Sequence, residues 1–366
     1  MKFLCLKDNL KEGLSIVEKI VDRNTALPIL EYFLLNTEKG QLIITGTNLE
    51  IGIQSKVQGK VEEDGALTTP ARILTQLISI SHQEKVFLEG DSTHLTIKDE
   101  KTSSTLKSLD PEDYPLFPTF TPEGSFTLQV KDLREALEMV SFSLSGSDTR
   151  PELSGVFVDI SSKEIVFAAT DSFRLAEKRI PHSTNLSPFS FIIPTRTVQE
   201  IVRISTLRPQ GELTAEFNKN QITFHHPNAT LASRLVSHTF PDYQQIIPQG
   251  VKTELVVDRK EFQHALQLAS VIAGKFKEVT LLFEGDQHFI VRAKNQELGE
   301  YESKVPLKKQ RGDSLSISFN VSYLLDVFHT STGPEIQLQF FGESRPGMVK
   351  FPSDAHYLYL IMPLRS

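Results

Sequence analysis

Apolar residues recur with the period of an amphipathic helix in three widely separated segments of the chain. Leu133 lies 123 residues after Leu10, and Phe262 lies 129 residues after Leu133. In each segment, apolar residues at i, i+4 and i+7 form one face of a helix. The pattern predicts helices over Asp8–Val21, Lys131–Phe142 and Arg259–Ile272. A short alternating strand precedes each helix, over Phe3–Leu6, Phe126–Val130 and Glu254–Val257.

A second series of helical patterns keeps the same phase. These helices open at Thr69-Pro70-Ala71-Arg72, Ile193-Pro194-Thr195-Arg196 and Phe319-Asn320-Val321-Ser322. Proline in two of the three openings is typical of a helix start. Pro194 lies 124 residues after Pro70, and Asn320 lies 126 residues after Pro194. The two series therefore repeat together.

Strand-rich stretches lie between the two helices of each repeat, with turn residues where hairpins belong. The predicted strands are Tyr32–Asn36, Gln41–Thr45 and Ile51–Gly59; Gly155–Ile160, Ile165–Ala169 and Leu175–Ile180; Val279–Glu284, His288–Ala293 and Glu300–Val305. A further strand pair follows each second helix, as in Glu212–Phe217 with Gln221–His225.

Each repeat therefore consists of two similar halves, each a strand, a helix and three strands. Leu74, on the second helix, lies 64 residues after Leu10 on the first. One half cannot bury the apolar faces of both its sheet and its helix, but two halves stacked helix on helix can. The sequence predicts an α+β fold of three tandem domains over residues 1–122, 123–250 and 251–366, each with two helices packed on antiparallel sheets.

Three such domains in a row leave an unpaired edge strand at either end. Two chains joined end to end satisfy both edges and close about a two-fold axis. We therefore expect a homodimer that closes as a ring of six domains.

Composition narrows the class of protein. Hydrophobic residues make up 39% and charged residues 23% of the chain, as in ordinary globular proteins. No apolar run approaches the roughly 18 to 20 residues of a membrane span, and the first residues become charged too soon for a signal peptide. One cysteine, Cys5, can form neither an internal disulfide nor a zinc site by itself. We expect a cytoplasmic protein without metal, cofactor or membrane association.

The net charge of −7 argues against tight, sequence-blind binding of nucleic acid, but a surface can be acidic on one side and basic on the other. The helix faces carry many of the basic side chains: Lys7, Lys11, Lys19, Arg72, Lys131, Arg134, Arg196, Arg203, Arg208, Arg259 and Lys260. The predicted strands carry much of the acidic excess. A basic lining inside an acidic rim would hold a polyanion by enclosure and let it slide. Solvated helix faces of mixed charge are the alternative.

An enzyme is the competing class of function. The sequence has no phosphate-binding loop, dinucleotide glycine fingerprint, zinc spacing or nucleophile elbow. His225 and His226 resemble a metal pair, but adjacent strand residues face opposite sides. Asp171 with Arg174, or Asp242 with Tyr243, could be acid–base groups, although turn residues explain both pairs. A peptide-binding scaffold without DNA is the third possibility.

Several motifs resemble the bacterial DNA polymerase III beta subunit, the sliding clamp. They are Leu27-Pro28-Ile29-Leu30, Thr45-Gly46-Thr47-Asn48-Leu49-Glu50, Ala169-Thr170-Asp171-Ser172-Phe173-Arg174-Leu175-Ala176, Phe240-Pro241-Asp242-Tyr243, Phe319-Asn320-Val321-Ser322-Tyr323-Leu324-Leu325-Asp326-Val327 and Met362-Pro363-Leu364-Arg365-Ser366. The resemblance spans the whole chain in order. It implies three DNA-clamp domains in a head-to-tail homodimeric ring around double-stranded DNA, which tethers the replicative polymerase without catalysis of its own.

The resemblance also implies a pocket between the second and third domains that binds short, partly hydrophobic motifs. Its partners would be the DNA polymerase III alpha subunit, the clamp-loader complex and other proteins with a clamp-binding motif. The implied pocket residues are Leu153, Thr170, Phe173, Arg174, Leu175, Pro241, Ile246, Asn320, Tyr323, Leu360, Met362, Pro363, Leu364 and Arg365. Phe173 stands where histidine is frequent in the family, and Ser366 where an apolar residue is frequent.

For contact with DNA, the resemblance suggests Arg23 and the loop around Ser147-Asp148-Thr149-Arg150. Arg72 and Arg196 lie at predicted helix starts, where phosphate binds readily. Arg203 lies on the same helix as Arg196 and completes the set of expected DNA contacts.

Overall fold

The computed structural model describes residues 1–21, 27–98, 101–146, 149–183, 187–285, 287–330 and 333–364. The chain divides into two compact units. Unit 1 comprises Met1–Lys131 with Arg203–Leu235, and unit 2 comprises Asp132–Val202 with Val236–Ser366. Each unit is described by itself.

The order of elements confirms the threefold repeat. The first repeat has β1 (Lys2–Leu6), α1 (Lys7–Val17), β2 (Tyr32–Glu38), β3 (Gln41–Thr47), β4 (Ile51–Val57), β5 (Lys60–Glu63), β6 (Ala66–Pro70), α2 (Ala71–Ile80), β7 (Lys85–Gly90), β8 (His94–Lys98) and β9 (Ser103–Lys107). The second has β10 (Gly124–Gln129), α3 (Val130–Ser141), β11 (Gly155–Ile160), β12 (Glu164–Thr170), β13 (Arg174–Pro181), β14 (Phe189–Pro194), α4 (Thr195–Leu207), β15 (Glu212–Phe217), β16 (Gln221–His226) and β17 (Ala229–Arg234).

The third repeat has β18 (Thr253–Asp258), α5 (Arg259–Ala273), β19 (Glu278–Phe283), β20 (His288–Asn295), β21 (Gly299–Gly312), β22 (Leu315–Asn320), α6 (Val321–Asp326), β23 (Glu335–Phe340), β24 (Gly347–Phe351) and β25 (Asp354–Ile361). The helices match the expected segments closely. Two details differ: β5 is an additional strand, and Pro70 and Pro194 end strands directly before the helices instead of lying inside them.

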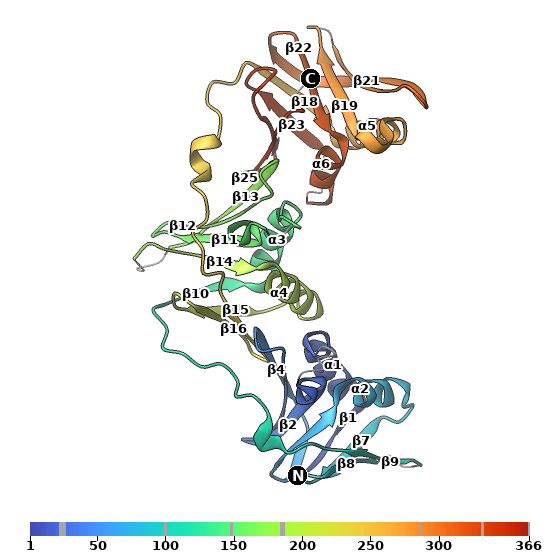
Figure 1. Cartoon of the computed structure of the whole chain (residues 1–366), viewed down its shortest axis with the longest axis vertical. Coiled ribbons are helices and arrows are strands. Elements are labelled where there is room, and N and C mark those ends of the chain that lie inside the picture. The colour runs from blue at the N-terminus through green and yellow to red at the C-terminus, as the bar shows by residue number, and fades with distance from the viewer. Residues whose placement is uncertain are drawn as a thin grey trace. The chain divides into compact units, whose positions relative to one another are not determined.

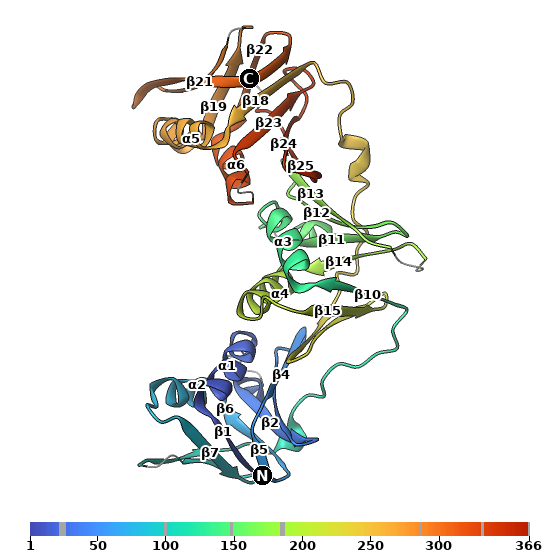
Figure 2. The same ribbon diagram turned by 180° about the vertical axis from the view of Figure 1, so that it is seen from behind.

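Successive repeats are joined by antiparallel strand pairing. In unit 1, β17 of the second repeat pairs with β4 of the first, with Leu231 opposite Ile53. In unit 2, β25 of the third repeat pairs with β13 of the second, with Tyr359 opposite Ala176. Figures 1 and 2 both show β13 and β25 side by side within unit 2. The hydrogen-bonded sheets therefore continue from one repeat into the next.

The helices pack their apolar faces on these sheets. In unit 1, Leu10 and Leu14 of α1 are fully buried, as is Leu74 of α2. In unit 2, Phe262 of α5 meets Phe289 of β20 and Phe328 edge-on, with ring centroids 5.2 and 5.8 Å apart. The repeats therefore form equivalent hydrophobic cores from different side chains.

Within the described residues, no helix combines the length and the hydropathy that a bilayer crossing requires.

Tyr114 fixes the segment after β9 to the first repeat. Its buried hydroxyl donates to the carbonyl oxygens of Tyr32 and Thr45, at 3.1 and 3.2 Å. Burial raises the pKa of Tyr114 above its usual range, so the hydroxyl remains a donor.

We expect Tyr114→Phe to lower the free energy of unfolding by about 1–2 kcal/mol, because buried carbonyls lose their donor. Denaturant unfolding measures the change. The control is Leu116→Ala, two residues further along, where a side chain that is 94% exposed should contribute almost nothing. Equal stability of the two variants would contradict the anchoring role of Tyr114.

Candidate functional site: an apolar pocket in unit 2

A buried apolar floor joins the second and third repeats inside unit 2. Leu175 of β13 lies directly opposite Leu360 of β25 in the strand ladder. Both pack in one core cluster with Leu153, Phe240, Tyr243, Phe341 and Met348. Thr170, at the end of β12, is also buried. The pairing of two distant strands therefore brings Leu175 and Leu360 into one buried cluster.

Four of the expected pocket residues have exposed apolar side chains. Phe173 is 60% exposed, and Ile246, Met362 and Leu364 are exposed as well. The amide of Met362 donates to the carbonyl oxygen of Phe173 at 2.8 Å, which holds the C-terminal segment beside the β12–β13 turn. Several large apolar side chains left in water on one surface are typical of a site for a partner.

The turn between β12 and β13 presents Phe173 outward. One carboxylate oxygen of Asp171 accepts hydrogen bonds from the amides of Phe173 and Arg174, at 2.9 and 3.0 Å. The hydroxyl of Thr170 donates to the carbonyl oxygen of Arg174 at 2.6 Å. Ser172 has a positive φ of 78°, which the two side chains stabilise. Asp171 and Thr170 therefore hold the turn as structural residues.

Arg174 is enclosed by acidic and aromatic groups. Its Nε donates to Asp171 at 3.0 Å, and its Nη1 donates to Asp326 on α6. The guanidinium carbon lies 4.5 Å from the centre of the Tyr323 ring and 5.6 Å from that of Phe142. Burial opposes the charge, but Tyr359, Asp326 and Asp171 together raise the pKa of Arg174. Arg174 thus remains charged and ties α6 to β13.

Aromatic stacking and a buried carboxylate stabilise the floor from below. The rings of Phe157 and Phe240 stack with centroids 4.7 Å apart. The hydroxyl of Tyr243 donates to the buried Glu177 at 2.5 Å, and Arg179 donates to the same carboxylate at 2.7 Å. Burial raises the pKa of Tyr243 above its usual range. Tyr243 is therefore a structural donor, and the sequence-based alternative of an acid–base pair with Asp242 finds no support.

Four of the remaining expected pocket residues are described by the structure: Asn320, Tyr323, Pro241 and Pro363. Asn320 caps α6, since its side-chain oxygen accepts from the amide of Ser322 at 3.0 Å. The backbone carbonyl of Tyr323 accepts from the hydroxyl of the buried Tyr359 at 2.9 Å. Pro241 is exposed and Pro363 is half-buried. Arg365 and Ser366 lie outside the described residues.

The five arginines expected to contact DNA lie in different surroundings. Arg72 and Arg196 are exposed in the first turns of α2 and α4. Arg203 donates to the carbonyl oxygens of Ser15 and Ile16 at 2.7 and 2.5 Å, at the end of α1. Arg23 lies outside the described residues, as do Ser147 and Asp148 of the expected DNA-contacting loop.

Arg150 contacts the turn between β12 and β13. Its Nη1 donates to the hydroxyl of Ser172 at 2.6 Å, next to the exposed Phe173. The following short helix, Pro151–Leu153, carries Leu153 into the floor. The expected contact of Arg150 with DNA stays a prediction.

The two adjacent histidines have separate partners. His225 lies 3.3 Å from a carboxylate oxygen of Glu216, and His226 lies 3.2 Å from the carbonyl oxygen of Gln210. Across the described part of the chain, no group of three or more His, Cys, Asp or Glu side chains could hold a metal ion.

Three α+β repeats joined by shared strand ladders, with a buried apolar cluster shared by the second and third, define the class of DNA clamps. Comparison with known families agrees with this class. Models of the N-terminal, central and C-terminal domains of the DNA polymerase III beta subunit match residues 1–118, 127–242 and 244–365, in that order. The chain belongs to the DNA polymerase III beta subunit family.

Relatives cover the chain from end to end. It is 29% identical over 376 residues to the beta sliding clamp of Staphylococcus aureus, and 29% identical over 382 residues to that of Bacillus subtilis, with all of both chains covered. Among solved structures, the sliding clamp of Pseudomonas aeruginosa bound to griselimycin superposes with a TM-score of 0.96 at 26% identity. The Bacillus subtilis clamp gives 0.94 at 27%. The matches cover all of this chain and 99–100% of those chains.

The family confirms the fold class and the function expected from the sequence. The chain has three tandem clamp domains that close as a homodimeric ring of six domains. It is a sliding clamp of DNA replication, which holds duplex DNA and tethers the polymerase, and it is a non-catalytic processivity subunit. The enzyme alternative is thereby set aside.

We expect Arg174→Gln to lower the free energy of unfolding by about 1–3 kcal/mol, because Asp171 and Asp326 lose their cation. Breaking a fully buried ion pair costs about 3–5 kcal/mol, and the partial exposure of Asp326 reduces that figure. Thermal unfolding measures the effect. Arg292→Gln is the control, since its ion pair with Glu302 is exposed at the surface. If both variants melt alike, Arg174 does not tie α6 to β13.

Proposed function

We propose that the unit 2 pocket is where this clamp captures the clamp-binding motifs of the DNA polymerase III alpha subunit, the clamp loader and other partners. The supporting observation is the exposed apolar set of Phe173, Ile246, Met362 and Leu364 above a fully buried floor. Anchors of a partner peptide would cover these side chains and remove them from water.

The peptide would lie on a surface that is already organised. Asp171 and Thr170 hold the Phe173 turn, and Arg174 fixes α6 against it. Little side-chain ordering then remains to oppose binding. Arg150 contacts the same turn through the Ser172 hydroxyl, next to Phe173, and we add it to the proposed pocket.

Arg72 and Arg196 carry the proposal for contact with DNA. Each is exposed in the first turn of a second helix, where backbone N–H groups and the helix dipole also favour phosphate. Arg203 has two guanidinium nitrogens engaged by the end of α1, so its role in this proposal is to join α4 to α1 within unit 1. Arg23 stays a prediction from the resemblance.

Two further assignments accompany this proposal. The domain boundaries are 1–122, 123–250 and 251–366, and the ring acts in the cytoplasm, where bacterial DNA is replicated.

The pocket is tested with a fluorescent peptide that carries the clamp-binding motif of the alpha subunit. We expect Phe173→Ala and Met362→Ala each to weaken binding at least about fivefold, and deletion of Met362–Ser366 to abolish it. In each variant the apolar anchors of the peptide lose the side chains against which they would pack. Leu116→Ala is the control, because its side chain is apolar and exposed but lies outside the proposed pocket. All variants should remain dimeric. Unchanged peptide affinity in the deletion variant would refute the pocket.

Enclosure of DNA is tested by loading the protein onto circular duplex DNA with a clamp loader and then cutting the circle. We expect retention on the circle and release after linearisation, because weak phosphate contacts cannot hold a ring on an open end. The double variant Arg72→Ala, Arg196→Ala should leave linearised DNA only slightly faster than the unaltered protein, and the difference should appear at low salt. Equal retention on circular and linear DNA would contradict topological holding.

A further inference from the structure

The turns that open β4 and β13 have the same geometry. Thr47 and Thr170 each donate the side-chain hydroxyl to the carbonyl oxygen four residues later, at 2.9 and 2.6 Å. Leu49 and Ser172, two residues after these threonines, have positive φ values of 74° and 78°. Because each turn opens the strand that pairs with the next repeat, the two places can be compared position by position.

The strands that follow these turns pair in the same register. We call the pairing of β4 with β17 the first junction and that of β13 with β25 the second junction. Gly52 and Leu175 each lie five residues after the threonine of their turn, and their strand partners are Ala232 and Leu360. The two leucines lie in the buried cluster of the proposed pocket. The two junctions therefore share a backbone geometry, but the first has very small side chains at these positions.

The exposed positions of the two junctions differ in charge. Glu50 and Phe173 each lie three residues after the threonine of their turn. Their carbonyl oxygens accept hydrogen bonds from the amides of Arg234 and Met362, at 3.1 and 2.8 Å. All four side chains are exposed. The first junction thus carries a carboxylate and a guanidinium where the second carries two apolar side chains.

Phe117, in the segment that links the first repeat to the second, covers Gly52. A methyl carbon added to the buried Gly52 would lie 3.1 Å from the Phe117 ring and 3.2 Å from the Pro118 ring, closer than ordinary van der Waals contact. Phe117 is half-buried, whereas its neighbour Leu116 is 94% exposed. The ring therefore lies between Gly52 and the solvent, and we call the space over Gly52 the seat.

The two linking segments have corresponding residues. Tyr114 and Tyr243 each follow an aspartate, and each donates a hydrogen bond from a buried hydroxyl. Phe117 and Ile246 each lie three residues after that tyrosine. Ile246 is 52% exposed and belongs to the proposed pocket. The counterpart of a side chain that borders the open pocket thus covers the strand at the first junction.

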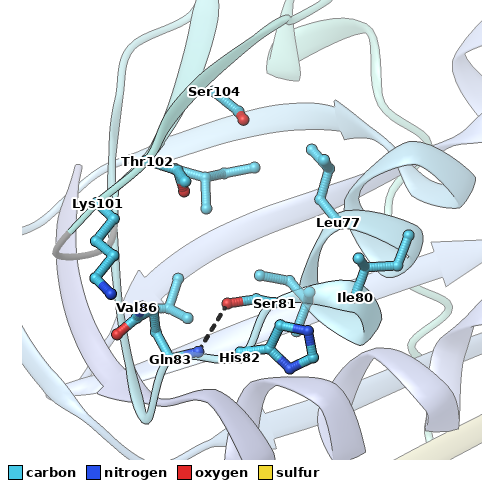
Figure 3. A pocket seen from close by; sticks show the side chains of 11 residues that line it. Leu77, Ile80, Ser81, His82, Gln83, Val86, Lys101, Thr102 and Ser104 are labelled. Atoms are coloured by element: carbon cyan, nitrogen blue, oxygen red, sulfur yellow. Dashed lines mark hydrogen bonds between the residues drawn. The ribbon is translucent and has the colours of Figure 1, made fainter.

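Unit 1 also contains an open apolar cavity, which is distinct from the seat. It measures about 370 Å³, and Leu77, Ile80 and Val86 are among the side chains around it (Figure 3). Among the described pairings, β9 is the last strand of its sheet, so this cavity lies at the free end of the first repeat. The seat lies at an internal junction instead, and the chain itself fills it.

We propose that the first junction is a closed copy of the unit 2 pocket, in which Phe117 fills the seat and confines partner peptides to the second junction. The inference rests on the proposed function of the unit 2 pocket and adds the residues that give each chain one peptide site instead of two. Phe117 acts by covering the strand. Glu50 and Arg234 act by removing the apolar rim against which a peptide anchor would pack.

The seat is tested by exchanging the side chains that fill it. Phe117→Ala should lower the melting temperature by at least about 3 °C, whereas Leu116→Ala should leave it unchanged. Gly52→Leu should lower the melting temperature of the native chain, because the leucine meets the Phe117 ring. In the Phe117→Ala variant it should raise the melting temperature, because a leucine then fills the seat as Leu175 does at the second junction. If Gly52→Leu gives no increase there, Phe117 does not fill the seat.

Closure of the first junction is tested by counting bound molecules of the fluorescent alpha-subunit peptide at saturation. The native chain should bind one. The fourfold variant Glu50→Phe, Gly52→Leu, Phe117→Ala, Arg234→Met should bind two, because it carries the floor and rim residues of the second junction. Glu50→Phe with Arg234→Met is the matched control, which has the apolar rim but keeps Phe117 over Gly52, and it should bind one.

Deletion of Met362–Ser366 separates this proposal from that of the unit 2 pocket. The deletion alone should bind no peptide, and the fourfold variant in the same background should bind one. A second peptide on the matched control, or a single peptide on a folded fourfold variant of the full chain, would overturn the closed copy and leave the unit 2 pocket intact. Absence of binding to the native chain would refute the unit 2 pocket instead, and the melting temperatures would still decide whether Phe117 fills the seat.

Discussion

Antiparallel pairing between the last strand of one repeat and the fourth strand of the repeat before it is the interaction on which this protein depends. A repeat that ended in an unpaired edge would present a row of free backbone donors and acceptors. In units 1 and 2 the pairings Ile53–Leu231 and Ala176–Tyr359 remove such edges. The same ladder thus continues the sheet and positions the helices. The last strand of the first repeat and the fourth strand of the third repeat have no such partner repeat within the chain.

The pocket is a consequence of this pairing. Leu175 and Leu360 become neighbours only because β13 and β25 share a ladder, and Phe173 is placed above them by the turn that opens β13. Arg174 then uses Asp326 on α6 to fix the third repeat against that turn. Backbone pairing and an ion pair therefore hold the parts that two repeats contribute to this site.

Periodicity alone predicted nearly every helix and strand, since the apolar faces of Leu10, Leu133 and Phe262 must be buried whatever surrounds them. It missed β5, a short strand that carries mostly charged residues, and it put Pro70 inside a helix that begins one residue later. The composition of the pocket came from the resemblance to the family. The contacts of Arg203 and Arg150 could not be predicted, because the carbonyls of α1 and the hydroxyl of Ser172 that engage them are distant in the sequence.

The three kinds of junction between domains of the ring differ in their thermodynamic requirements. The internal junctions join parts of one chain, so a few polar contacts such as Arg203 on the α1 carbonyls and Arg174 on Asp326 suffice to fix their geometry. The closing junction must also offset the translational and rotational entropy of association, which is estimated at about 4–15 kcal/mol. Burial of large apolar side chains is the main favourable term available for that purpose.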